Sequence, residues 1–268
     1  MKKIVKNSAL VTLALLVLSN STQAVFADET VIDKSYNSNA VVEFEADTES
    51  TGPVDPLDPD PNNPVDPFDP TNPPTYEPDP GTGGPLGIDF ASSIDFGSNK
   101  ITSKDVTYYA NPQYYFNADK TGPDLTRPRP NYIQVSDKRG TNAGWTLTVK
   151  QNGQLTNEET QNSVLTSAAI TLANGSAVSN VEGVIAPTTY EVELNPNGDS
   201  AKVMAAAKGN GSGTWVDLFG TVEDIQDGEE TVKKNKSVSL FIPGTTPIDA
   251  VKYSTSLTWT LASTPNNE

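Results

Sequence analysis

The last apolar stretch of the chain alternates strictly between large apolar and hydroxyl side chains. Residues 256–262 read Ser-Leu-Thr-Trp-Thr-Leu-Ala, and residues 145–149 repeat the order Trp-Thr-Leu. Side chains at i and i+2 share one face of a strand, so each run places Trp and Leu together and Thr opposite. The two runs therefore predict half-buried strands, and we expect them to be neighbours in one sheet.

Short runs rich in Val, Ile, Thr, Tyr and Leu continue from residue 85 to the end, divided by Gly, Asn and Pro. No window has a sustained helical period, and the Ala-rich run at 203–207 is cut short by glycines. This pattern predicts a single all-β domain, a β-sandwich or a barrel-like fold. An Asn-Gly pair at 152–153 is a candidate hairpin turn. The expected strands are 94–96, 106–110, 132–136, 145–151, 168–173, 189–194, 202–207, 214–219, 238–242 and 257–262.

Composition excludes several kinds of chemistry. The 268 residues include no Cys and no His, so a thiol nucleophile, a Ser-His-Asp triad and a Cys- or His-ligated zinc site cannot form. The net charge of −16 argues against binding nucleic acid or an anionic membrane by charge. Two acidic turns, 193–198 and 223–228, begin like calcium loops, but Met204 and Ile225 stand at ligand positions. We expect no metal and no cofactor.

The N-terminus has the pattern of a secretory signal peptide. Lys2, Lys3 and Lys6 precede an apolar run at 9–18, which is too short to span a bilayer. Small residues favour cleavage after Ala27, with Ala24 as the alternative. The sequence thus predicts a signal peptide at 1–27, and an exported mature chain with no membrane span.

Two further segments precede the expected domain. Residues 28–52 are short and polar, with one strand-like run at 40–45 that either docks as an edge strand or stays loose. Residues 53–85 hold 12 of the 21 prolines and repeat the motif Pro-Val-Asp-Pro. Proline donates no amide hydrogen bond, so this stretch is expected to be a disordered, acidic, Asp/Pro-rich spacer in polyproline II conformation. The domain itself is expected at 86–268.

Aromatic side chains are the best candidates for ligand contact, because sugar rings stack on aromatic faces. Consecutive Tyr residues in a strand face opposite ways, so at least half of the cluster is expected in the core. The candidate glycan contacts are Tyr108, Tyr109, Tyr114 and Tyr115. Four basic residues either meet anionic wall polymers or lie on solvated loops; they are Arg127, Arg129, Lys138 and Arg139. Glu191 and Glu193 share a face and are expected to be solvated rather than catalytic.

Together, these features resemble the WxL-domain cell-surface proteins of low-GC Gram-positive bacteria. The two Trp-Thr-Leu triplets are the main signal, since one of them closes the chain, and the resemblance covers nearly the whole chain. Further matching elements are the Asp-Pro repeats, the pair Gly144-Trp145, Gly213-Thr214-Trp215, Phe219-Gly220, Ile242-Pro243-Gly244 and Tyr253.

The resemblance implies a protein held non-covalently on the cell wall through peptidoglycan, with this domain as the anchor. It also implies partner surface proteins encoded alongside. The family motif maps to Trp145, Leu147, Trp259 and Leu261, which either pack in the core or touch the wall. One alternative is an adhesin or surface-complex subunit whose main ligand is a host matrix protein or a partner protein. Another is a secreted glycoside hydrolase, which needs two carboxyl groups facing each other across a cleft.

Overall fold

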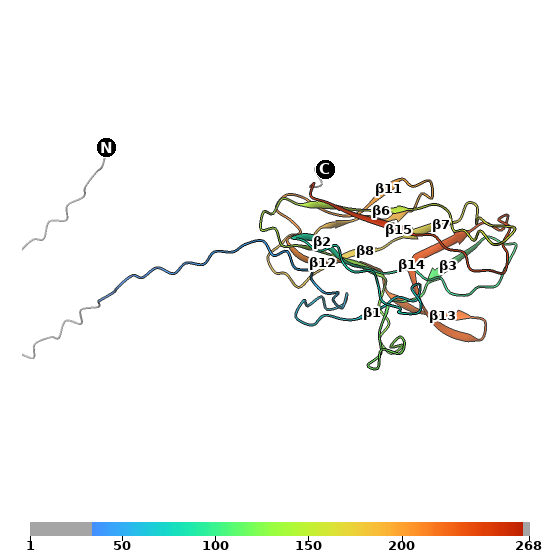
Figure 1. Cartoon of the computed structure of the whole chain (residues 1–268), viewed down its shortest axis with the longest axis horizontal. Helices are drawn as coiled ribbons and strands as arrows, with labels where there is room; N and C mark the ends of the chain where they lie inside the picture. Colours follow the sequence, from blue (N-terminus) through green and yellow to red (C-terminus); the bar gives the residue numbers. More distant parts are fainter. Residues whose placement is uncertain (1–33, 265–268) are drawn as a thin grey trace, which may run out of the picture. The chain divides into compact units, whose positions relative to one another are not determined.

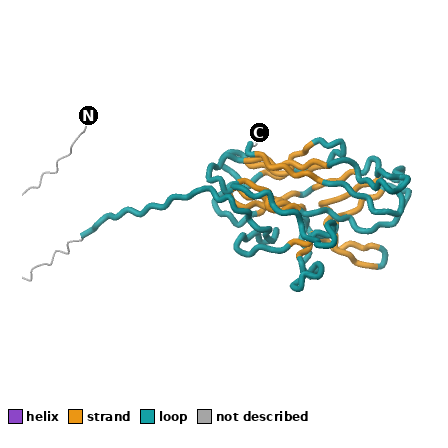
Figure 2. The backbone as a smooth tube through the Cα atoms, viewed as in Figure 1, coloured by secondary structure: helices purple, strands orange, loops and turns teal. Residues whose placement is uncertain are grey.

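The computed structural model describes residues 34–264, and these form an all-β protein (Figures 1 and 2). No helix occurs in that range, and none is therefore long and apolar enough to cross a membrane. Residues 34–43 belong to a separate unit, which is extended, exposed and without regular structure. Of the two alternatives for residues 40–45, the edge strand does not form. The expected signal peptide lies outside the described residues.

The compact unit begins at Phe44 and contains three larger sheets and one two-stranded pair. All pairings are antiparallel, and no sheet closes into a barrel. The first sheet has the order β2 (Leu86–Ala91), β5 (Tyr132–Asp137), β12 (Gly213–Phe219), β8 (Gly175–Val178). The second has the order β15 (Leu257–Ala262), β6 (Trp145–Gln151), β11 (Ser200–Ala206), β9 (Thr188–Thr189).

The third sheet lies mainly to the right of these two in Figure 1 and is formed around the long strand β14 (Glu230–Ile242). One half of β14 pairs with β7 (Ala169–Leu172) and β3 (Val106–Ala110), and the other half forms a hairpin with β13 (Val222–Asp227). β10 (Val192–Glu193) extends the sheet beyond β7. A small pair joins β1 (Pro67–Phe68) to β4 (Tyr114–Tyr115).

Alternation along the strands builds the main core. The inward residues of β5 and β12, Ile133, Val135, Trp215 and Phe219, belong to the same buried cluster as Trp145 of β6. Residues from all three larger sheets contribute to this cluster. The described part is therefore an open β-sandwich, which agrees with the all-β expectation and decides against a barrel.

The opposite face of the first sheet is also covered, and its cover is the Pro-rich segment. Val54 is fully buried in a second cluster with Phe90, Tyr132, Val216 and Leu218. The expectation of a disordered spacer at 53–85 therefore needs correction. Proline prevents a central strand here, but it does not prevent apolar side chains between the prolines from packing on a finished sheet.

Polar side chains of the first sheet bind the backbone of this segment. The side chain of Gln134 accepts a hydrogen bond from the Val54 amide at 2.8 Å and donates one to the Gly52 carbonyl at 3.0 Å. The Tyr132 hydroxyl donates to the Val54 carbonyl at 3.0 Å. These hydrogen bonds satisfy polar groups that burial would otherwise leave unpaired, so the segment has a defined position on the sheet.

Acidic residues within this segment and just before it neutralise basic residues of the domain. Asp55 holds Arg129 through two hydrogen bonds of 2.7 Å and lies 3.5 Å from Arg127. Burial opposes ionisation of Asp55, but hydrogen bonds from Arg129 and the Leu57 amide, with the charges of Arg129 and Arg127, outweigh it and keep the pKa of Asp55 below its usual value. Asp47 pairs with Lys138 at 2.8 Å. The basic residues proposed for anionic wall polymers are thus already paired, and Arg139 likewise pairs with its neighbour Asp137.

Most expected strands are confirmed, but five strands were not predicted from the sequence, namely β1, β2, β4, β8 and β13. Residues 94–96 form no strand, and 189–194 is divided between β9 and β10. The Asn152-Gly153 turn closes no hairpin, because β6 pairs with β11 and β15 instead of with the next strand in sequence. The expected strand at 202–207, which includes the Ala-rich run, is confirmed as part of β11.

Candidate functional site

The two Trp-Thr-Leu runs are neighbouring strands, as the sequence predicts. β15 pairs with β6 so that Leu261 lies opposite Leu147 and Trp259 opposite Val149. The pairing joins residues more than 100 positions apart in the chain. β15 forms one edge of its sheet, because no other described strand pairs with its free side.

The two copies of the motif differ in burial. Trp145 and Leu147 are fully buried, and the Trp145 indole donates a 2.9 Å hydrogen bond to the carbonyl of Gly211. Trp259 and Leu261 are only partly buried against the same core, because β15 is an edge strand. The Thr residues of β15 are exposed. The motif is therefore structural at β6, while its second copy also reaches the surface.

A pocket of about 170 Å³ lies where the Pro-rich segment meets the loop after β3. Apolar and polar groups line it together, as in many sites for small ligands. The apolar part comes from Tyr114, Phe68, Pro70, Pro112, Pro123 and Leu125, and the polar part from Ser93, Asp95, Asn111 and Gln113. Tyr114 was predicted from the sequence as a ligand contact, whereas the contribution of the Pro-rich segment was not, because only tertiary packing places that segment here.

The four candidate Tyr residues separate. Tyr114 lines the pocket, and Tyr108 packs against the main core. Tyr109 is half-buried on the other face of β3. Tyr115 is buried beneath Arg127, whose guanidinium lies 5.0 Å from the ring centroid. Of the four, the structure brings only Tyr114 into the pocket.

A second pocket, of about 320 Å³, is more open and is lined by Glu193 with residues 167–169 and 194–196. Each pocket contains a single carboxylate, Asp95 in the first and Glu193 in the second. A glycosidase needs an opposed pair. No group of three or more acidic residues that could hold a metal ion occurs within residues 34–264. Of the two acidic turns that begin like calcium loops, the one at 223–228 lies largely in β13.

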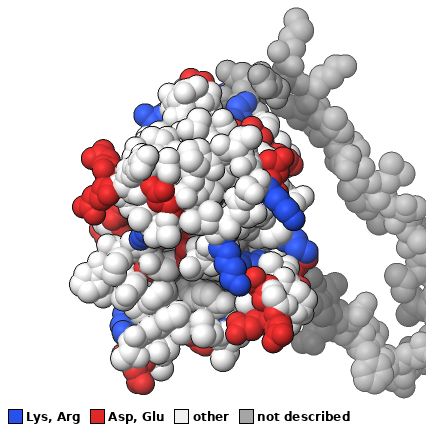
Figure 3. Space-filling view, turned by 90° about the vertical axis from the view of Figure 1, so that its right-hand side faces the viewer, with Lys and Arg blue, Asp and Glu red and all other residues white. Residues whose placement is uncertain are grey.

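Charge does not mark out a binding surface on the face drawn in Figure 3. On that face, a broad uncharged area is bordered by separate acidic and basic groups instead of a continuous charged patch. Polar and aromatic contacts are therefore better suited than net charge to recognise a ligand on this face.

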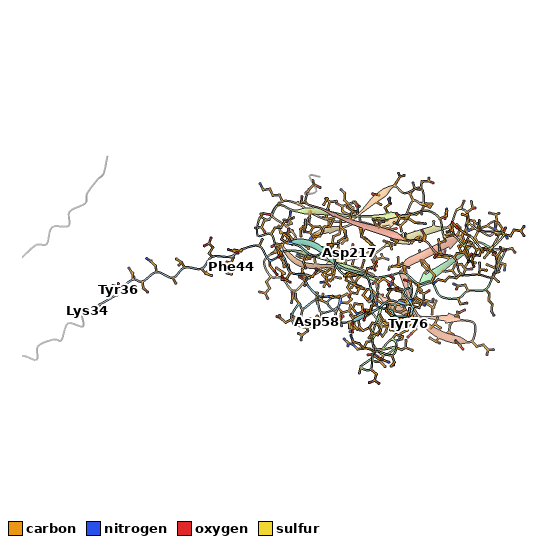
Figure 4. The ribbon with its side chains drawn as sticks, viewed as in Figure 1. Lys34, Tyr36, Phe44, Asp58, Tyr76 and Asp217 are labelled. Carbon is orange, nitrogen blue, oxygen red and sulfur yellow. The ribbon has the colours of Figure 1, made fainter. Side chains whose placement is uncertain are left out.

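Two buried acids were missed from the sequence, since both lie in strands with no distinguishing motif. Asp217 is buried in β12 between Trp215 and Phe219, at the place labelled in Figure 4. No hydrogen bond of good geometry reaches either of its carboxylate oxygens, although the nearby Ser176 amide favours the charged form. Burial raises its pKa to about 7. Asp89 lies beneath the Pro-rich segment and accepts a 2.6 Å hydrogen bond from Ser136. Burial raises the pKa of Asp89 to about 6, although its hydrogen bonds oppose the shift.

Such pKa shifts often mark active sites, but neither acid lines a pocket. Their effect is on stability. Between about pH 4 and 7 the folded state keeps the Asp217 proton that the unfolded state releases, so stability falls as pH rises through this window. Asp89 acts in the same direction up to about pH 6. We expect the free energy of unfolding, measured by urea titration, to be higher at pH 5 than at pH 8.

The variant Asp217→Asn isolates this contribution. It removes the buried charge but leaves an amide without partners, so we expect a gain of about 2 kcal/mol at pH 8 and little change at pH 4. Asp119→Asn, at an exposed position, serves as the control and should change neither value. An equal effect of Asp217→Asn at both pH values would show that Asp217 does not titrate in this window.

Comparison with known families agrees with this architecture. A family model described as the WxL domain, a surface cell wall-binding domain, matches residues 31–265. The chain belongs to the WxL-domain family. The resemblance inferred from the two Trp-Thr-Leu runs is thereby confirmed, and the chain is a cell wall-binding surface protein by family. No curated protein and no solved structure matches it significantly.

The WxL match starts before the Pro-rich segment and includes it. This agrees with the packing of Val54 and with the contribution of Phe68 to the pocket. In this WxL protein the segment is part of the folded domain. The WxL family is described as one of surface domains that bind the cell wall.

Proposed function

We propose that this WxL domain anchors an exported, non-enzymatic protein on the cell wall by binding peptidoglycan without a covalent bond. The observation that carries the proposal is the WxL match across residues 31–265. The Tyr114 pocket supplies the chemistry, because an aromatic ring beside several amide and hydroxyl groups suits a sugar.

The polar groups of the pocket are held in place before any ligand binds. The Gln113 side chain donates hydrogen bonds to the carbonyls of Phe68 at 2.9 Å and Tyr114 at 2.7 Å. The Asn111 amide donates to Asp95 at 2.8 Å, and Ser93 donates to Asp69 at 2.7 Å. A preformed pocket loses little conformational entropy on binding, which favours a specific ligand.

The experiment is co-sedimentation of the purified protein with washed cell-wall sacculi. We expect the wild-type protein to pellet, and Tyr114→Ala to bind about tenfold more weakly because the stacking surface is lost. Tyr36→Ala removes a fully exposed tyrosine outside the compact unit and should bind like the wild type. Circular dichroism establishes that both variants are folded.

Two results would contradict the proposal. If the folded wild-type protein stays in the supernatant, wall anchoring is wrong. If binding disappears when teichoic acids are stripped from the sacculi, the ligand is the anionic polymer and not peptidoglycan. Equal binding of Tyr114→Ala and wild type would remove the pocket from the binding site while leaving anchoring intact.

A second function, as an adhesin or a subunit of a surface complex, is favoured by strand β15. Its free edge offers unpaired backbone groups to a partner strand, and its exposed residues Thr258 and Thr260 are hydrophilic. Saturable binding of a host matrix protein or another surface protein to the immobilised domain supports this role. Such binding is compatible with wall anchoring.

A further inference from the structure

Lys234 and Asn111 meet at the boundary between β14 and the loop that follows β3. The two strands are paired there, with Asn235 opposite Ala110. The Lys234 Nζ lies 2.7 Å from the Asn111 Oδ1. The Lys234 nitrogen therefore lies one bond away from contact with the Asn111 carboxamide carbon, because Oδ1 is bonded directly to that carbon.

A carboxylate completes the arrangement. Asp95 Oδ2 accepts a hydrogen bond from the Asn111 Nδ2 at 2.8 Å, and its Oδ1 accepts one from the Gly97 amide at 2.8 Å. The backbone fixes the same neighbours, since the Asn111 amide donates to the Asp95 carbonyl at 2.7 Å. An amine, a carboxamide and a carboxylate thus lie in a single hydrogen-bonded row.

The loop at residues 95–97 lies against this row. The carbonyl of Phe96 lies 3.4 Å from the Lys234 Nζ. Gly97 has a φ of 77°, and a Cβ at this position would lie 3.4 Å from the Lys234 Nζ and 3.5 Å from the Asn111 Nδ2. Burial lowers the pKa of Lys234, and the nearby charges of Asp95 and Asp227 only partly oppose this shift. The amine is therefore more readily deprotonated than a free lysine, which makes it a better nucleophile.

We propose that Lys234 and Asn111 form an intramolecular isopeptide bond, with Asp95 as the acid–base group. The Lys234 nitrogen attacks the Asn111 carboxamide carbon, and the C–N bond to the side-chain nitrogen breaks. Asp95 takes a proton from the attacking nitrogen and gives it to the departing one. The neutral amine and the carboxamide thus become a secondary amide and one ammonia, with no oxidant, reductant or cofactor required.

Two features of the chain suit such a cross-link. Asn111 precedes Pro112, whose nitrogen bears no hydrogen, so the side-chain amide cannot cyclise on the following backbone nitrogen. The chain has no Cys and hence no disulfide. The new bond would join β14 to the end of β3 beside a register shift between Asn235 and Ser239, where the strand pairing is interrupted.

The test is tryptic peptide mapping by mass spectrometry of the purified protein after prolonged incubation. We expect a branched peptide that joins residues 105–120 to residues 234–236 and is lighter than their sum by one ammonia. Trypsin should also fail to cleave after Lys234, because the acylated side chain no longer carries a charge. Intact mass alone does not suffice, because an Asn-Gly pair such as 152–153 also loses ammonia when it cyclises.

Variants separate the alternatives. Lys234→Arg and Asp95→Asn should lack the branched peptide, and Lys233→Arg should keep it, since Lys233 pairs with Asp224 outside the row. Circular dichroism confirms that each variant is folded. Absence of the branched peptide from the folded wild-type protein would overturn the proposal. The proposal would also be wrong if the wild-type protein loses a single ammonia and Lys234→Arg still loses the same one. A cross-link in Asp95→Asn at the wild-type rate would remove the role of Asp95.

Discussion

A chain that begins at residue 86 is expected to lose cooperative folding, whereas a chain that begins at residue 44 should unfold like the longer protein. The shorter chain lacks Val54, which covers Phe90, Tyr132, Val216 and Leu218. Each large apolar side chain returned to water costs about 1.5–3 kcal/mol, so the total loss is about 5 kcal/mol or more. That is comparable to the entire stability of many domains.

The measurement is chemical denaturation followed by tryptophan fluorescence. The chain from residue 44 is the matched control, because residues 34–43 form a separate unit. If the shorter chain fails to express, Val54→Ala in the full chain tests the same packing contact. We expect it to lower the free energy of unfolding by about 2 kcal/mol. Equal stability of the two truncated chains would show that the segment is a spacer after all.

Replacing Trp145 with Ala is expected to cost about 4 kcal/mol of unfolding free energy, near the upper range for a single core substitution. Trp145 is fully buried, and its loss leaves a cavity and a buried Gly211 carbonyl without its donor. Gly211 packs so closely that a Cβ there would lie 3.0 Å from the indole nitrogen. The surroundings therefore have little freedom to adapt to a different side chain.

Trp259→Ala is the matched comparison from the same motif. Because Trp259 is only partly buried, we expect a loss of about 2 kcal/mol, which leaves the domain folded. Urea denaturation gives both values, and the sacculus assay gives the binding of Trp259→Ala. Equal losses at the two positions would contradict the different burial of the two strands. Weaker wall binding by a folded Trp259→Ala protein would make the edge strand a contact surface.

The two copies of the WxL motif therefore have different roles, although both read Trp-Thr-Leu. In β6 the motif lies on a central strand and its Trp is a core residue. In β15 the same residues lie on an edge strand, where each side chain is only partly buried. The difference arises from position in the sheet and not from the residues themselves, so alternation could not reveal it.

The candidate pocket was predictable only in part. A cluster of Tyr residues around residue 111 indicated the region, since aromatic side chains suit sugar rings. Which Tyr lines the pocket depends on Arg127 covering Tyr115 and on Phe68 arriving from the Pro-rich segment. Both are long-range contacts between loops, and no local pattern in the sequence encodes them.

The sequence by itself determined the all-β class, the two-residue period of each strand and the family, because these depend on local alternation and on a short motif. Only the tertiary structure decided that the Pro-rich segment is a folded layer. Proline fixes the local backbone and predicts an extended chain in either case. Whether that chain stays free depends on a complementary surface, and β2, β5 and β12 create this surface only after they pair.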